Sequence, residues 1–290
     1  MLQNYYLGGP LWANKNWVGH VYPSNTKATH LLRQYATIFN TVEGSTTFYS
    51  LPNNETIQRW RADTPAHFRF SFKFPEVITH QRKLHNVRNE MALFLRTMEP
   101  LTEKIGNLFI QLPPNFDRFG LEVLQKFLLS LPPDFVYSLE VRHLDFYTTD
   151  YAERLNDMLR TFGINRAMFD TVELFKLKNP TDEDVIEAQR KKPRMPEYFV
   201  ATAQNPFLRY VGHKTLDPNT QRLEIIATKV AEWIRAGLQP FVYFHTPSDY
   251  EALHLARYFH QILAKNTDLV LGTLPPFGAE LYSNEQGNLF

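Results

Sequence analysis

The chain has 290 residues, of which 43% are hydrophobic and 14% are aromatic, so a disordered chain is excluded and a large buried core is expected. Its 31 basic and 30 acidic residues give a formal net charge of +1, so no global field favours nucleic acid or an acidic membrane surface. The absence of cysteine excludes disulfides, thiolate metal ligands and a cysteine nucleophile.

The first residues lack the basic and apolar segments of a secretory signal. No apolar run approaches the roughly 20 residues that are needed to cross a bilayer. We therefore expect a soluble, cytoplasmic protein with no membrane partner.

Short apolar runs alternate with amphipathic stretches along the chain, a pattern typical of parallel α/β architecture. Strands are predicted at residues 5–9, 41–46, 69–74, 107–112, 136–142, 165–170, 207–212 and 240–245. Helices are predicted at residues 26–36, 54–63, 87–101, 121–130, 149–162, 221–236 and 249–264. Eight strands with intervening helices predict a (β/α)8 TIM-type barrel over residues 1–264, followed by a C-terminal extension over 265–290. A doubly wound open sheet is the alternative.

The connection 176–204, before the seventh strand, departs from this alternation because it is long, charged and contains prolines. We expect a loop or lid there in place of a regular helix, with residues 197–202 extended. Its basic cluster at 190–194, RKKPR, is interpreted as a solvated face, and a phosphate or nucleic-acid contact is the alternative.

Polar side chains share one face in several of the predicted strands. Because side chains alternate along a strand, Ser138, Glu140 and Arg142 point one way while Leu139 and Val141 point the other. In a barrel the apolar face lies against the helices and the polar face lines the lumen, and residues late in a strand reach the C-terminal mouth, where barrel enzymes keep their active sites. The residues predicted at the mouth are Glu43, Lys73, Gln111, Glu140, Arg142, Asp170, Arg209 and His245.

The charge balance of this set indicates the kind of ligand. Divalent-metal sites need an excess of acids and neutral imidazoles, because fixed cations compete with the ion, so we predict no cofactor and no metal ligands, without excluding a divalent metal. Arginine and lysine beside acids suit a small polar or anionic ligand that carries phosphate or carboxylate. The candidate catalytic residues are Glu43, Glu140, Asp170 and His245, with Glu140 or Asp170 as general base and His245 or Lys73 as acid. The candidate ligand-binding residues are Lys73, His80, Gln111, Arg142, Arg209, Trp12 and Tyr243.

Phosphate-binding loops, dinucleotide fingerprints, zincin motifs and serine-hydrolase elbows are all missing from the sequence. These motifs would have named a reaction, and nothing in the spacing of the polar residues does so.

Residues 41–52, TVEGSTTFYSLP, resemble the V-E-x-x-S/T-T-F-Y-x-x-P block of the YecE-like family, the domain of unknown function numbered 72. The segments QLPP at 111–114 and EVRH at 140–143 are similar to further motifs of that family. The resemblance implies a TIM-type barrel and carries over Glu43, Lys73, Glu140 and Arg142, but it implies no reaction because the family's activity is not established. Val211 stands where the family's seventh-strand motif has histidine. The resemblance therefore does not imply that this chain shares a substrate with the family.

The last five residues, QGNLF, are similar to the peptide by which bacterial proteins dock on the DNA-polymerase sliding clamp. Gln286, Leu289 and Phe290 are the predicted anchors, and a frayed tail is the alternative. The sequence thus leaves three hypotheses: an acid–base enzyme acting on a small anion, a nucleic-acid-processing protein that docks on the clamp, and a non-catalytic ligand-binding module.

Overall fold

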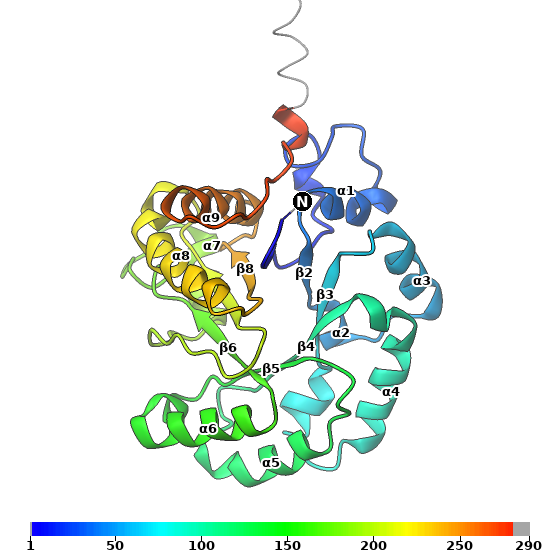
Figure 1. Ribbon diagram of the computed structural model, residues 1–290, viewed down its shortest axis with the longest axis vertical. Helices are drawn as coiled ribbons and strands as arrows, with labels where there is room; N and C mark the ends of the chain where they lie inside the picture. The colour runs from blue at the N-terminus through cyan, green and yellow to red at the C-terminus, as the bar shows by residue number, and fades with distance from the viewer. Residues whose placement is uncertain (1, 281–290) are drawn as a thin grey trace, which may run out of the picture.

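The computed structural model describes residues 2–280, and in them eight parallel strands form one sheet of order β1-β8-β7-β6-β5-β4-β3-β2 (Figure 1). The strands are β1 (Tyr6–Gly8), β2 (Thr41–Gly44), β3 (Arg69–Lys73), β4 (Ile105–Gln111), β5 (Tyr137–Glu140), β6 (Asn165–Asp170), β7 (Phe207–Val211) and β8 (Phe241–His245). The helices outside them are α1 (Leu31–Ile38), α2 (Thr46–Tyr49), α3 (Asn54–Asp63), α4 (Arg88–Met98), α5 (Leu121–Leu129), α6 (Thr149–Thr161), α7 (Glu183–Lys191), α8 (Thr220–Arg235) and α9 (Ala252–Asn266). The (β/α)8 barrel is confirmed.

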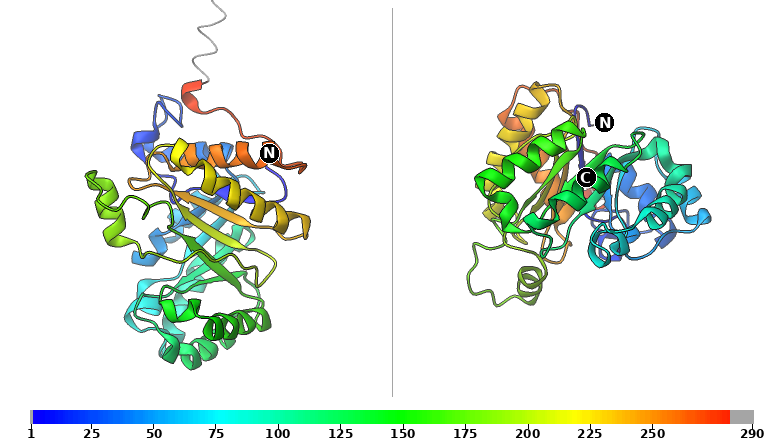
Figure 2. Two further views of the ribbon diagram at one scale, coloured as in Figure 1. Left: turned by 90° about the vertical axis from the view of Figure 1, so that its left-hand side faces the viewer. Right: turned by 90° about the horizontal axis from the view of Figure 1, so that it is seen from below.

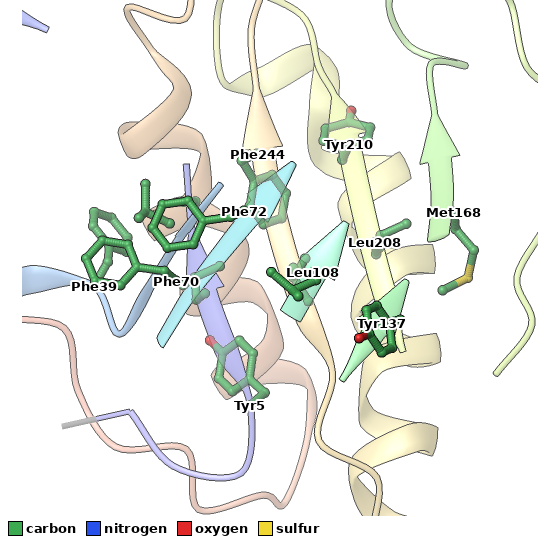
Figure 3. Packing of buried hydrophobic residues seen from close by; sticks show 14 of the residues in the cluster. Tyr5, Phe39, Phe70, Phe72, Leu108, Tyr137, Met168, Leu208, Tyr210 and Phe244 are labelled. Atoms are coloured by element: carbon green, nitrogen blue, oxygen red, sulfur yellow. The ribbon is translucent and has the colours of Figure 1, made fainter. Parts of the chain in front are cut away.

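Apolar side chains on the outer face of the strands pack under the helices. Phe70 and Phe72 of β3 are fully buried, and Trp60 of α3 stacks on Phe72 with ring centroids 5.4 Å apart. Figure 3 shows this packing continuing along the neighbouring strands through Leu108 and Leu208. Each such side chain contributes about 1.5–3 kcal/mol on burial, so the outer layer is the main source of stability.

A second, smaller apolar layer fills the lumen below the mouth. Phe109 and Phe207 stack at 5.0 Å, and Tyr243 lies against Phe207 at the same distance. The Tyr243 hydroxyl forms hydrogen bonds with Thr41 (2.8 Å) and Ser71 (2.6 Å). This layer closes the middle of the barrel, so the polar groups above it face a floor of aromatic rings.

Two side chains, those of Asn40 and Tyr35, bridge the seam between β1 and β2. One backbone hydrogen bond crosses it, from the Glu43 N–H to the Gly9 carbonyl (3.1 Å). Between the strands, the Tyr35 hydroxyl of α1 accepts from the Gly9 N–H (2.8 Å) and donates to the Thr41 carbonyl (2.8 Å). A Cβ at Gly8 would lie 2.1 Å from the Thr41 carbonyl oxygen, so the close approach of the two strands requires glycine there.

We expect Tyr35→Phe to lower the free energy of unfolding by about 1–3 kcal/mol, because the change leaves a buried N–H and a buried carbonyl without their partner. Urea unfolding at pH 7 measures the loss. Tyr49→Phe is the matched control, since Tyr49 is 79% exposed, and we expect it to change stability by less than about 0.5 kcal/mol. Equal stabilities of the two variants would show that the hydroxyl does not hold the seam.

The connection between β6 and β7 is long and mostly irregular, as predicted, but it contains helix α7, which was not predicted. Asp182 caps this helix by accepting from the Asp184 and Val185 N–H groups, and Val185 and Ala188 bury its inner face. Two apolar anchors in nine residues are a weak periodic signal, which explains why the helix was missed. Residues 197–202 belong to no strand. Figure 2 shows α7, in yellow-green, set apart from the ring of helices.

The segment after α9 returns to the N-terminal part of the barrel (Figure 1). Leu271 and Phe277 are buried in the main core, and the Gly278 N–H donates to the Val21 carbonyl (2.8 Å). No helix within residues 2–280 is long and apolar enough to cross a membrane. The predicted clamp anchors Gln286, Leu289 and Phe290 lie outside the described residues, so clamp docking stays a prediction.

Candidate functional site

Arg209 of β7 occupies the centre of the barrel mouth. Its side chain faces the lumen because the flanking Leu208 and Tyr210 belong to the outer core. The Nε and Nη2 groups donate to the two carboxylate oxygens of Glu43 on β2 (2.7 and 2.9 Å), and Nη1 donates to Glu140 on β5 (2.7 Å). All three side chains are buried, so one guanidinium ties together strands that are far apart in the sequence.

The ion pairs continue on both sides of this centre. Arg142 lies two residues beyond the last residue of β5, and its Nε donates to the second oxygen of Glu140 (2.7 Å) while its Nη2 donates to Gln111 of β4 (2.9 Å). On the other side, His245 Nε2 of β8 lies 3.3 Å from Glu43. The structure thus brings together most of the predicted mouth residues, in one chain that runs from His245 through Glu43, Arg209, Glu140 and Arg142 to Gln111.

The two carboxylates at the mouth are held as anions. Burial by itself raises the pKa of Glu43, but the charges of Arg209 and His245 outweigh it and hold the pKa well below the usual carboxyl range. At Glu140, too, burial raises the pKa, but the charges of Arg209 and Arg142 outweigh it, so the pKa is lowered. Carboxylates that are ionised and fully hydrogen-bonded are weak proton acceptors near neutral pH. The predicted role of Glu140 as general base is therefore not favoured by its surroundings.

Lys73, the last residue of β3, is the amine at the mouth. Its Nζ lies 3.9 Å from the centre of the Phe48 ring, and it forms no ion pair with any carboxylate among residues 2–280. Burial, followed by the neighbouring charges of Arg209 and Arg142, lowers the pKa of Lys73 to about 7. A ring contact stabilises a cation by only about 0.5–1 kcal/mol at such partly exposed sites, so it replaces a missing carboxylate poorly.

His80 reaches the mouth from the π-helical turn Val77–Gln81 that follows β3. Its Nδ1 shares a hydrogen bond with the Thr79 hydroxyl (2.9 Å), and its ring meets the Phe48 ring edge-on at 4.9 Å. Burial and the charge of Lys73 lower the pKa of His80 to about 4, so the imidazole is neutral at neutral pH. π-Helical turns are often found at functional sites.

A cavity of about 390 Å³ opens above the ion-pair chain. Glu43, Arg209 and His245 form its floor, and the first loop contributes Trp12, whose ring meets Trp60 edge-on at 5.4 Å. The size suits a small ligand.

Lys192 and Asp249 also line this cavity, and neither was among the predicted site residues. Lys192, expected on a solvated face, is half-buried directly after α7, and burial lowers its pKa while Asp249 opposes that shift. The Asp249 carboxylate accepts from the Thr246 N–H (3.1 Å) and lies 3.8 Å from His245 Nδ1. Only tertiary contacts bring these two loop residues to the mouth.

Of the predicted site residues, Trp12, Glu43, Arg209 and His245 line the cavity. Two others do not reach the mouth. Asp170 faces the helices and not the lumen, because Phe169 is the lumen-facing residue of β6, with the Arg209 guanidinium 4.7 Å from its ring. The Asp170 carboxylate instead pairs with Arg222 of α8 (2.6 Å). Tyr243 is fully buried in the aromatic floor, so it supports the site and does not reach a ligand in the cavity.

The described residues contain no group of three or more histidine or acidic side chains arranged to hold a metal ion. Glu43 and Glu140 already have arginine partners, and arginine competes with a metal for the same oxygens.

Residues 6–278 match the family model described as protein of unknown function DUF72. The chain belongs to the DUF72 family. It is 37% identical to the UPF0759 protein YecE of Escherichia coli K12 over 286 residues, which cover 98% of this chain and 99% of that protein. The corresponding protein of E. coli O157:H7 is 36% identical over the same shares of the two chains.

Solved structures of DUF72 proteins share the fold. One from Thermotoga maritima superposes with a TM-score of 0.70 at 22% identity, covering 90% of this chain and 99% of that chain. One from Enterococcus faecalis superposes with a TM-score of 0.69 at 16% identity, covering 94% and 98%. The DUF72 assignment therefore gives the barrel and its mouth, and the chemistry has to be argued from the side chains.

Proposed function

We propose that the barrel mouth binds a small anion that carries carboxylate or phosphate, and that it performs acid–base chemistry on this ligand. The observation that carries the proposal is a surplus of cations. Glu43 and Glu140 are committed to Arg209 and Arg142, whereas Lys73 has no carboxylate partner among the described residues. A bound anion supplies the missing negative charge.

Lys192 adds a cation to the lining of the ligand cavity, beside Arg209, and the acid next to it, Asp249, is also engaged by the Thr246 N–H. A lysine ammonium acts as a point charge toward phosphate or carboxylate, and a half-buried one is screened by water less than a surface lysine. Lys192 is therefore proposed to contact the anion directly.

Lys73 is the group proposed to exchange protons with the ligand. A general acid or base works best when its pKa lies near the working pH, and the pKa of Lys73 is about 7. An anion bound beside Lys73 favours its protonated form, so ligand binding and proton uptake are coupled. Lys73 thus replaces Glu140 and Asp170 as the candidate proton acceptor.

We expect Lys192→Gln to weaken the binding of small anions about tenfold, or ~1.4 kcal/mol, because it removes one charge from the cavity wall. Isothermal titration calorimetry with inorganic phosphate and with small mono- and dicarboxylates is the measurement. Lys191→Gln is the matched control: it removes the same charge from the adjacent residue, whose side chain is 65% exposed and paired with Glu187. Equal losses in both variants, or no anion binding by the unmodified protein, would contradict the proposal.

A further inference from the structure

We infer that the ligand of the barrel mouth is an aromatic acid, an anion whose carboxylate or phosphate group is attached to a flat ring, and that this ring stacks on Tyr49. The inference rests on the proposed anion site. To that site it adds a substrate class and a residue that selects it.

The first support is that the lining of the ligand cavity has a charged part and an apolar part. The charged part consists of Glu43, Arg209, His245, Lys192 and Asp249. The apolar part comes from one segment, residues 10–13 with the sequence PLWA, together with the ring of Tyr49, and Ser45 and Thr46 complete the lining. An acid group contacts only the charged part, so a ligand that fills the cavity also presents an apolar surface.

The second support is the size of the cavity. Its volume is about 390 Å³, whereas one water molecule takes about 30 Å³ in the liquid. A carboxylate or phosphate group has the bulk of a few water molecules and fills only a minor part of this space. The remaining space lies beside the apolar part of the lining, where a ring attached to the acid group finds room.

The third support is that helix α2 holds Tyr49 out of the core and at the cavity. Thr47 and Phe48 are the buried residues of this helix, and the Thr47 hydroxyl donates to the Lys73 carbonyl (2.6 Å). Thr46 and Tyr49 are three residues apart, so they share the opposite face, and both line the cavity. The Tyr49 ring is 79% exposed as a result. An exposed ring that its own helix fixes at a cavity wall offers a flat face on which a ligand ring can stack.

Trp12 gives the apolar part a second ring that is held in place. It meets Trp60 edge-on at 5.4 Å and Phe70 at 6.1 Å, and its carbonyl accepts from the Tyr22 hydroxyl (2.9 Å). Binding a flat, rigid ligand against side chains that are already ordered costs little conformational entropy, whereas a flexible alkyl chain loses its own freedom on binding. The cavity therefore favours a ring over an alkyl chain of similar size.

The acid group of the ligand is assigned to Lys192. Arg209 also lines the cavity, but its guanidinium is shared between Glu43 and Glu140. One ligand is thus held at two ends, its charge by Lys192 and its ring by Tyr49.

The test compares phenyl phosphate, butyl phosphate and inorganic phosphate by isothermal titration calorimetry on the full chain. We expect phenyl phosphate to bind at least about tenfold more tightly than the other two, since stacking on an aromatic side chain commonly contributes a factor of this order. Benzoate against acetate repeats the comparison for carboxylates, and a preference for the ring in either pair supports the inference.

Variants of Tyr49 assign the preference to its ring. Tyr49→Leu keeps an apolar side chain and removes the flat face, so we expect most of the tenfold preference for phenyl over butyl phosphate to disappear. Tyr49→Phe keeps the ring and should keep the preference. Phe119→Leu is the matched control, because Phe119 is 80% exposed and lies outside the cavity lining. Circular dichroism checks that each variant is folded.

The outcomes separate the ring from the anion site. Equal affinities for phenyl and butyl phosphate, both weakened by Lys192→Gln, would overturn the ring and leave the anion site standing. Binding of none of these phosphates and carboxylates would overturn both. A preference for phenyl phosphate that survives in Tyr49→Leu, or that falls equally in Phe119→Leu, would overturn the assignment to Tyr49. Phenol, which has the ring and no acid group, would contradict the substrate class if it bound as tightly as phenyl phosphate.

Discussion

Replacing Arg209 by methionine is expected to lower the free energy of unfolding by about 3–5 kcal/mol at pH 7, because it leaves two buried carboxylates without their shared counter-charge. The side chains of Glu43 and Glu140 are 1% and 0% exposed, so bulk water does not solvate either carboxylate in the folded protein. Urea unfolding followed by circular dichroism measures the loss. Arg235→Met is the control, since the side chains of Arg235 and its partner Asp268 are 50% and 82% exposed, and we expect a change below about 1 kcal/mol there.

The pH dependence gives this prediction a second readout. In the unmodified protein the pKa values of Glu43 and Glu140 are lowered, so their pairing adds stability above the unfolded carboxyl pKa and loses it as the pH falls through the folded values. Without Arg209, burial is opposed only by Arg142 at Glu140 and by His245 at Glu43, so both pKa values rise and the acids protonate more readily. The difference in the free energy of unfolding between the unmodified protein and Arg209→Met should therefore become smaller from pH 7 to pH 4. Adding Glu43→Gln and Glu140→Gln to the variant should recover part of the loss. A stability difference that stays constant with pH, or a loss no larger than that of Arg235→Met, would show that the ion pairs do not support the mouth.

The barrel and the centre of its mouth could be predicted because strand alternation is a local signal. Glu43 and Arg209 are polar residues flanked by apolar ones that pack outward, so the period of two placed both in the lumen. Their position late in the strands then placed them at the C-terminal end. Neither prediction depends on which strands are neighbours, so both are correct in the folded barrel.

Asp170 could not be placed by the same reasoning because the β6 sequence, NRAMFD, has polar residues in both phases, so the period of two gives no single polar face. Its position at the end of the strand alone placed it at the mouth, although it lies in phase with Met168 of the outer core. A phase error of one residue places a side chain on the wrong face of the strand. Asp170 was predicted in the lumen, but it lies on the helix-facing side and pairs with Arg222. Lys192 was missed for another reason. Its place depends on how the 176–204 connection packs, and no periodicity reports on that.

Replacing Lys73 by methionine is expected to abolish anion binding and, at pH 6, to raise the free energy of unfolding. Methionine keeps the length and the apolar character of the side chain and removes the charge. The folded-state pKa of Lys73 is lowered to about 7, so below that pH the folded protein carries a buried charge that the unfolded chain carries in water. This penalty is present in full below pH 7 and disappears as the pH rises toward the ordinary lysine value near 10.5.

We expect Lys73→Met to be more stable than the unmodified protein by about 1–3 kcal/mol at pH 6, with the advantage shrinking between pH 7 and pH 10. Urea unfolding at pH 6, 8 and 10 measures it, and Lys191→Met, which loses an exposed charge, is the control. Lower stability of Lys73→Met at pH 6 would show that Lys73 is paired in solution and would remove the basis for both of its proposed roles. Higher stability of Lys73→Met at pH 6, together with loss of anion binding, would show that the mouth keeps a destabilising amine because its ligand requires it. A loss of stability in favour of binding is expected of a functional site and not of a structural ion-pair network.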